Sequence, residues 1–267
     1  MKKGLFLIAA VGIVLFATVS NMDSVQSKKL AGTDKYKVIK VDGKIVFEQT
    51  KESMKKGDIF LSGMALSFQT PQSRAAVISS LKGRFVLSAS EKGQTKILPA
   101  ANNISSRAGA LINMVDLQNH FAGKYLVLGS MELELGEEAF PMGEQSFFYL
   151  SYEHKGEQIR KKLSHHDNKL MLNEKEIFKI DGQPIPIEEK EMALYYRADG
   201  QSTKISEFTP VFPDLHDLKD EVAIILAEFS EKDKATKIKE VTSYLNEFYG
   251  NPQKENLTQW LEKEFDL

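Results

Sequence analysis

The sequence contains no cysteine among its 267 residues. This absence excludes disulfide bonds, zinc sites built on thiolates and a lipid anchor attached to an N-terminal cysteine. Hydrophobic burial must therefore hold the fold without covalent help. Hydrophobic residues make up 42% of the chain, which is adequate for a core of that kind.

An excess of charge of one sign is also missing. Lysine and arginine total 35 and aspartate and glutamate total 37, so the formal net charge is −2, and no long block of one sign occurs. A basic surface for nucleic acid would need such an excess. We therefore expect no nucleic-acid partner.

Motifs for catalysis and for cofactors are missing as well. There is no glycine-rich phosphate loop and no G-x-S-x-G nucleophile elbow. The densest polar cluster is His165-His166-Asp167, but adjacent residues on a strand face opposite ways and no third ligand lies at motif spacing. We interpret the cluster as an exposed turn and expect no catalytic residue, no metal site and no cofactor. One alternative stays open, namely a catalytic pair of carboxylates that only the folded structure brings together.

Long apolar runs are scarce, and the most prominent one stands at the start of the chain. Met1-Lys2-Lys3 precedes the uncharged run 4–19, and the polar pair Ser20-Asn21 follows it. Two lysines, an apolar core and a polar exit are typical of an export signal. We therefore expect the protein to work in the periplasm or cell envelope.

The length of this run bears on whether it is removed. Its sixteen residues would form a helix of about 24 Å, shorter than the roughly 30 Å hydrocarbon core of a membrane, which favours a cleaved signal. A cleavage site requires small residues at two positions, and here only Thr18 and Ser20 can fill them. A retained anchor in the inner membrane, through residues 4–19, therefore stays open, as does a buried helix in a cytosolic protein.

Short β-rich segments follow a polar spacer. Residues 36–41 and 45–47 flank Asp42-Gly43, a sequence typical of a two-residue hairpin turn. Glycine and proline separate the next strand candidates, which are 58–61, 64–69, 75–79 and 84–88. So many short strands in about fifty residues predict a small antiparallel barrel or sandwich.

Residues 36–88 also resemble a known family. The resemblance rests on the hairpin around Gly43, on Lys56-Gly57-Asp58, on a strand that ends at Thr70, and on the runs 73–77 and 82–87. This order is similar to the β-domain of FecR-type periplasmic proteins. The resemblance implies a periplasmic domain that receives or relays a protein contact and performs no chemistry. The family's signal relay to a sigma factor is not part of the expectation.

A second β-rich block follows a connection. We interpret 91–109 as a long connection and 111–121 as a short helix, because its apolar residues share one helical face. Glu132 and Glu134 alternate with apolar residues and are expected to face solvent. The predicted strands are 125–128, 131–135, 147–152, 158–163, 169–172, 176–180, 192–196 and 204–208.

Amphipathic helices are predicted after Pro213. Asp214 is a candidate N-cap for the first helix, Ser230 with Asp233 for the second, and Asn251-Pro252 for the third, while Gly250 is placed to end the second helix. Apolar residues recur at helical spacing in all three segments. Each helix therefore has an apolar stripe that must be covered.

Two interpretations of the last stripe remain open. Trp260, Leu261 and Phe265 can pack into the core, or they can form a docking face for a partner protein. Aromatic residues are common in both settings.

The sequence thus predicts a mainly β protein with a C-terminal α-helical segment, built from two small antiparallel β-domains (barrel or sandwich) and about three amphipathic helices. The expected divisions are a signal peptide or anchor (1–20), a linker (21–35), a first β-rich domain (36–98), a connection with a short helix (99–120), a second β-rich domain (121–212) and the helices (213–267). We expect a non-enzymatic bacterial envelope protein, a scaffold or adaptor whose partners are other envelope proteins. The alternative is a hydrolase that processes an envelope polymer. The oligomeric state stays undetermined.

Overall fold

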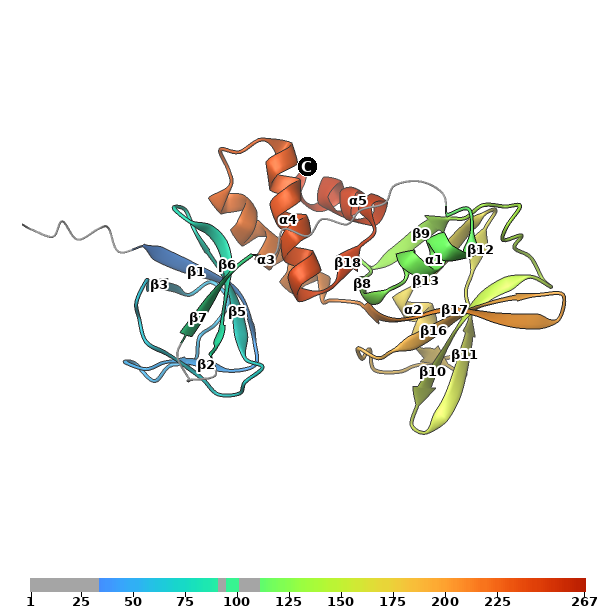
Figure 1. The fold of residues 1–267 in the computed structure, drawn as a ribbon, viewed down its shortest axis with the longest axis horizontal. Helices are drawn as coiled ribbons and strands as arrows, with labels where there is room; N and C mark the ends of the chain where they lie inside the picture. Colours follow the sequence, from blue (N-terminus) through green and yellow to red (C-terminus); the bar gives the residue numbers. More distant parts are fainter. Residues whose placement is uncertain (1–33, 91–94, 101–110) are drawn as a thin grey trace, which may run out of the picture. The chain divides into compact units, whose positions relative to one another are not determined.

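The structure is a computed structural model and describes residues 34–90, 95–100 and 111–267. The expected signal peptide (1–20) and nearly all of the expected linker (21–35) lie outside the described residues. Residues 35–267 form one compact unit, which Figure 1 shows as a ribbon. The described residues are mainly β, with 42% in strands and 24% in helices, and a helical segment follows the β-rich regions, as the sequence predicts.

Five antiparallel strands form the first sheet, in the order β3-β1-β5-β6-β7. The central strands β1, β5 and β6 are rich in branched apolar residues and are buried on both faces. The strands are β1 (Lys35–Asp42), β3 (Ile59–Leu61), β5 (Arg74–Ser79), β6 (Gly83–Ala89) and β7 (Thr95–Pro99).

The predicted hairpin at Asp42-Gly43 is wrong. The chain turns there, but β2 (Ile45–Phe47) pairs with β4 (Leu66–Phe68) in a separate sheet and does not pair with β1. Gly43 has φ +76°, and a Cβ added to it would lie 2.7 Å from the hydroxyl oxygen of Ser73. A glycine lets the backbone pass this close to Ser73. The turn therefore serves to carry the chain from one sheet to the other.

The expected long connection at 91–109 is wrong at 95–99, while its residues 91–94 and 101–109 lie outside the described residues. Residues 95–99 form β7, which pairs with β6 along its length. All five residues of β7 are exposed, so the apolar pattern that marks a buried strand is absent. Backbone pairing with a buried neighbour decides the conformation here.

The second β-rich region contains a six-stranded sheet in the order β11-β10-β16-β17-β8-β18. Two of its pairings, β17 with β8 and β18 with β8, are parallel, which corrects the expectation of purely antiparallel domains. A three-stranded sheet, β12-β13-β9, and a two-stranded one, β14-β15, accompany it. The strands are β8 (Gly123–Leu126), β9 (Ser130–Glu134), β10 (Phe147–His154), β11 (Glu157–Lys162), β12 (His165–His166), β13 (Lys169–Asn173), β14 (Lys179–Ile180), β15 (Gln183–Pro184), β16 (Met192–Ala198), β17 (Gln201–Val211) and β18 (Asn251–Pro252).

Several local expectations in this region can be compared with the structure. Glu132 and Glu134 are exposed on β9, as the alternation predicts. The predicted strand at 176–180 is wrong in its first half, because α2 (Glu174–Ile177) occupies that position and is capped by the side chain of Asn173. Counting the β2-β4 pair, the described residues form five sheets and no closed barrel.

Four further helices are α1 (Met114–His120), α3 (Leu215–Glu228), α4 (Lys234–Phe248) and α5 (Lys254–Phe265). Asp214 caps α3 as predicted, accepting hydrogen bonds from the N–H groups of His216 and Asp217. The N-cap of α4 is Asp233, whereas Ser230 was expected. Asn251-Pro252 does not start a helix, because the two residues form β18 beside β8.

The helical segment packs against the first sheet. Ile39, Ala76, Ile78 and Val86 of that sheet share one buried cluster with residues of α3, α4 and α5, and with Leu126 of β8. The opposite face of the first sheet has its own core, which includes Tyr36, Val38, Val77, Phe85 and Leu87. A third cluster fills the second β-rich region. Both faces of the first sheet are therefore buried.

Candidate functional site

Edge strand β3 exposes apolar side chains. Ile59 is 65% exposed and Leu61 is 43% exposed, while Phe60 between them is buried. One side of β3 pairs with β1, and no described strand pairs with its other side. Soluble proteins usually protect an edge strand with charges, proline or a bulge, because unpaired backbone groups beside apolar side chains bind other strands. Apart from its shortness, since β3 has only three residues, this strand carries none of these protections, which makes it a candidate interaction surface.

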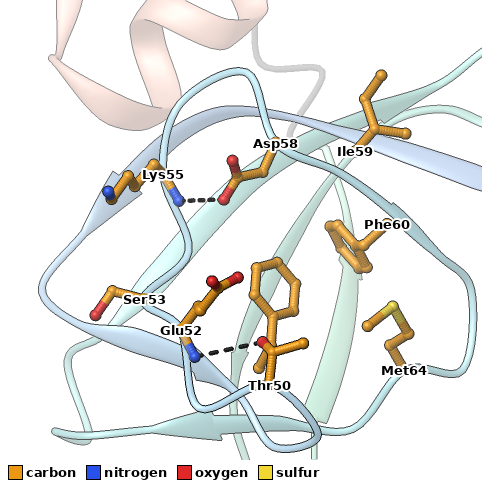
Figure 2. A pocket seen from close by; sticks show the side chains of 9 residues that line it. Thr50, Glu52, Ser53, Lys55, Asp58, Ile59, Phe60 and Met64 are labelled. Atoms are coloured by element: carbon orange, nitrogen blue, oxygen red, sulfur yellow. Dashed lines mark hydrogen bonds between the residues drawn. The ribbon is translucent and has the colours of Figure 1, made fainter.

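A groove lies beside this strand, with a volume of about 550 Å³. We call it the β3 groove, and Figure 2 shows it from close by. Its walls combine an apolar side with a polar side. The lining residues are Phe47, Thr50, Glu52, Ser53, Lys55, Asp58, Ile59, Phe60 and Met64.

Local hydrogen bonds fix the polar wall of the β3 groove. The Asp58 carboxylate accepts a hydrogen bond of 2.7 Å from the backbone N–H of Lys55, and the Thr50 hydroxyl accepts one of 3.3 Å from the N–H of Glu52. The tight turn at Gly57, whose N–H donates to the carbonyl oxygen of Val38, holds the segment against β1. The carboxylates of Glu52 and Asp58 therefore belong to a loop that hydrogen bonds hold near both of its ends.

A second pocket joins the two edges of the first sheet. Its volume is about 370 Å³, and its lining includes Phe60 of β3, Tyr36 of β1 and Ile97 of β7. We call it the seam pocket. Since β3 and β7 are opposite edges of the sheet, the sheet curls until residues of both edges line one pocket. Ile97 is 57% exposed although its pairing partner Leu87 lies in the core. Phe60 and Met64 line both the seam pocket and the β3 groove.

The predicted partner-binding residues lie in the helical core. Trp260 is 6% exposed and Leu261 is fully buried, and both belong to the cluster that covers the first sheet. Phe265 is partly buried, and its ring packs edge-on against that of Trp260 at 5.5 Å. This placement favours the core interpretation of the three residues.

His165 and His166 were interpreted as part of an exposed turn, but they form the short strand β12, and the chain turns only at Asp167. His165 is half-buried and His166 is exposed. The imidazole Nδ1 of His166 lies 3.3 Å from the carboxylate of Asp167, and both side chains are exposed. Among residues 34–90, 95–100 and 111–267, no group of three or more His, Asp or Glu side chains is arranged to hold a metal ion.

His120 is a partly buried imidazole. Its Nε2 lies 2.5 Å from the hydroxyl oxygen of Tyr125, at the wall of a smaller pocket of about 230 Å³. Burial lowers the pKa of His120 from 6.5 to about 4. Burial and the nearby Glu255 carboxylate raise the pKa of Tyr125. Both side chains are therefore neutral in the folded protein near pH 7.

This burial predicts a loss of stability in acid. Between the unfolded pKa of 6.5 and the folded pKa of about 4, the unfolded chain binds a proton at His120 that the folded chain does not, so stability falls as pH decreases. We expect His120 to account for about 2 kcal/mol of the stability lost between pH 7.5 and pH 5. Urea denaturation at both pH values should show a smaller loss for His120→Gln than for the wild type. Equal losses would contradict the assignment.

Sequence reasoning missed both the β3 groove and the seam pocket. Ile59 and Leu61 were expected to belong to a strand, but their exposure depends on which strands lie beside them. The signal that could have drawn attention was Ile59-Phe60-Leu61, three apolar residues in a row on a short strand between two glycines.

No helix in the described part of the chain has both the length and the apolar character needed to cross a membrane. Comparison with protein family models, with curated proteins and with solved structures found no match.

Proposed function

We propose that this chain is an exported, non-enzymatic envelope protein that binds an extended segment of another envelope protein at the β3 edge of its first sheet. Export rests on the apolar run 4–19 behind two lysines. Binding rests on the exposed apolar side chains of β3 beside an open groove. The protein acts as a scaffold or adaptor in an envelope assembly.

The observation that carries the proposal is the combination of a free strand edge with two pockets beside it. In strand addition, the backbone of an extended peptide pairs with a free edge and its alternate side chains enter pockets. The β3 edge supplies the backbone groups, and the β3 groove and seam pocket supply the cavities on either side of Phe60 and Met64. Such a site needs no reacting group.

The FecR-type resemblance of residues 36–88 supports the same proposal, because that family's β-domain receives protein contacts. We also propose two small β-domains with the boundaries that the sequence indicates, 36–98 and 121–212, the first of them a curled, open barrel. Limited proteolysis tests the division, since two protected β-rich fragments are expected and cleavage scattered within both regions would contradict it.

Site-directed photocrosslinking in the native envelope tests the binding site. A photoreactive residue at position 59 or 61 should crosslink a discrete partner protein, whereas one at the exposed position Ile187, in the second β-rich region, should not. Identification of the crosslinked peptide shows which segment of the partner occupies the edge. Equal crosslinking at all three positions, or none at any, would contradict the proposal.

A charge on the edge should remove binding and leave the fold intact. Ile59→Lys places an ammonium where a side chain is already 65% exposed, so the free energy of unfolding should change by no more than about 0.5 kcal/mol. Lysine on an edge strand blocks pairing with a further strand. We expect partner binding to fall at least about tenfold, measured by co-purification from mild detergent. The matched control Ile187→Lys, at a side chain that is 48% exposed, should bind normally.

The alternative function is a hydrolase acting on an envelope polymer. One observation favours it, namely that Glu52 and Asp58 line the same groove and paired carboxylates can act as acid and base. Against it, the Asp58 carboxylate already accepts a backbone hydrogen bond. Incubation of the protein with purified envelope glycan separates the two. Cleavage that Glu52→Gln abolishes would favour the enzyme, and intact glycan favours the scaffold.

A further inference from the structure

The β3 groove has two different walls. Phe47, Phe60 and Met64 form an apolar wall, and the rings of Phe47 and Phe60 meet at a centroid distance of 5.6 Å. Glu52 and Asp58 stand on the other side, and Figure 2 shows both carboxylates directed into the groove. An apolar stem with a polar end therefore fits this groove better than a purely apolar side chain.

The charges near the groove do not cancel. Lys55 lines it, but Figure 2 shows the Lys55 side chain extending away from the two carboxylates. Lys56, the next residue, is held by the helical segment, since its Nζ lies 2.9 Å from a carboxylate oxygen of Asp217 and 3.1 Å from one of Asp220. Burial by itself lowers the pKa of Lys56, but the hydrogen bonds and charges of Asp217 and Asp220 together outweigh it and raise that pKa. The Lys56 charge is thus directed toward α3. The groove thus presents two negative charges and no cation that points into it from its lining residues.

We propose that the β3 groove takes a lysine or arginine side chain of the bound segment. The methylene stem lies along Phe47, Phe60 and Met64, and the cationic head lies between the carboxylates of Glu52 and Asp58. Long basic side chains bury their stems on apolar surface in this way while the charged end stays hydrated. The inference rests on the proposed function, because it names the chemistry of the peptide that the β3 edge binds: an extended segment with one basic residue among apolar ones.

A selection experiment with the full chain tests this specificity. A library of random twelve-residue peptides is selected on the purified wild-type protein, and the peptides recovered are measured by fluorescence anisotropy. We expect sequences in which a lysine or arginine lies among apolar residues. Ile59→Lys should no longer bind them, which places them at the β3 edge.

A charge-neutral variant then isolates the groove. Glu52→Gln/Asp58→Asn keeps the size of both side chains, and the amide oxygen of an asparagine at position 58 can still accept the hydrogen bond from the N–H of Lys55. Its affinity for the selected peptides should fall about tenfold or more, and the loss should shrink at high salt. The control Glu157→Gln/Glu231→Gln, which removes two exposed glutamates elsewhere, should bind as the wild type does.

The outcomes separate the two proposals. Peptides that depend on Ile59 but carry no basic residue, or that bind the neutral variant as tightly as the wild type, would overturn the basic anchor and leave edge binding in place. Recovery of no peptide that depends on Ile59 would overturn the proposed function itself, and the basic anchor with it.

Discussion

Gly250→Ala is expected to lower the free energy of unfolding by about 4 kcal/mol. Gly250 follows α4 with φ +114°, a conformation that side-chain-bearing residues rarely adopt. A Cβ at this position would lie 2.6 Å from the carbonyl carbon of Lys124 and 2.7 Å from its Cβ. The backbone of β8 cannot move away, because Asn251 and Pro252 pair with it directly afterwards. The alanine variant must therefore separate β18 from β8 or distort the end of α4.

Gly182→Ala provides a matched control for this prediction. Gly182 also has a positive φ, +81°, but a Cβ there would meet nothing within 4 Å. Only the cost of the left-handed conformation remains, about 1 to 2 kcal/mol. Urea denaturation of both variants measures the difference. If Gly182→Ala costs as much as Gly250→Ala, the close approach of β8 is not what requires glycine at position 250.

Glu247→Ala should be nearly as destabilising, at about 3 to 5 kcal/mol. The Arg84 side chain is fully buried between β6 and α4, where it donates hydrogen bonds to the Glu247 carboxylate and, at 2.8 Å, to the Ser243 hydroxyl. Removal of the carboxylate leaves the Arg84 charge in a buried site without its counter-charge. The effect should concentrate where α4 meets the first sheet, so hydrogen exchange should speed up in α4 before it does in β10 or β16.

A surface pair gives the control for this second prediction. Lys124 and Glu189 form an ion pair in which both side chains are about half exposed (54% and 51%). Glu189→Ala should change stability by less than about 1 kcal/mol, since solvent already screens the pair. An equal loss in the two variants would mean that burial does not strengthen the contact between Arg84 and Glu247.

A second buried polar cluster, around Glu221, also holds the helical segment against the first sheet. Glu221 of α3 is 4% exposed, and its carboxylate accepts hydrogen bonds from the hydroxyls of Tyr244 and Tyr249, at 2.7 Å and 2.5 Å. Lys40 of β1 lies 3.5 Å from the same carboxylate. Burial, followed by the charge of Glu221, raises the pKa of both tyrosines. Polar groups of α3, β1 and the C-terminal end of α4 are thus paired with one another inside a contact that is otherwise apolar.

Local chemistry explains which expectations from the sequence succeeded. Lys155-Gly156, Asp181-Gly182 and Asp199-Gly200 all turn with positive φ, a conformation that glycine adopts freely and aspartate tolerates. Asp214 caps α3, and Gly250 ends α4. The expectations that failed depended on neighbours. Asp42-Gly43 is an equally good turn sequence, but the strand after it finds its partner in β4, which follows some twenty residues later.

The sequence could not predict the candidate site either, because exposure of an apolar side chain also depends on neighbouring elements. Trp260 and Leu261 were candidates for a docking face because they are large and apolar, and the structure buries them in one cluster with residues of α3 and α4. Ile59 and Leu61 attracted no such attention, and the structure leaves them exposed. Periodicity shows which residues share a face, but it does not show whether another element covers that face.

By itself the sequence determined the mainly β composition, most of the turns and the helices of the C-terminal segment, because each depends on residues within a few positions of one another. Only the tertiary structure decided which strands pair, which apolar faces are covered, and which edge of the first sheet stays open beside a groove with two carboxylates. Strand pairing and burial depend on contacts between residues far apart along the chain. The pattern of residues within a short segment does not show which distant residues will contact it.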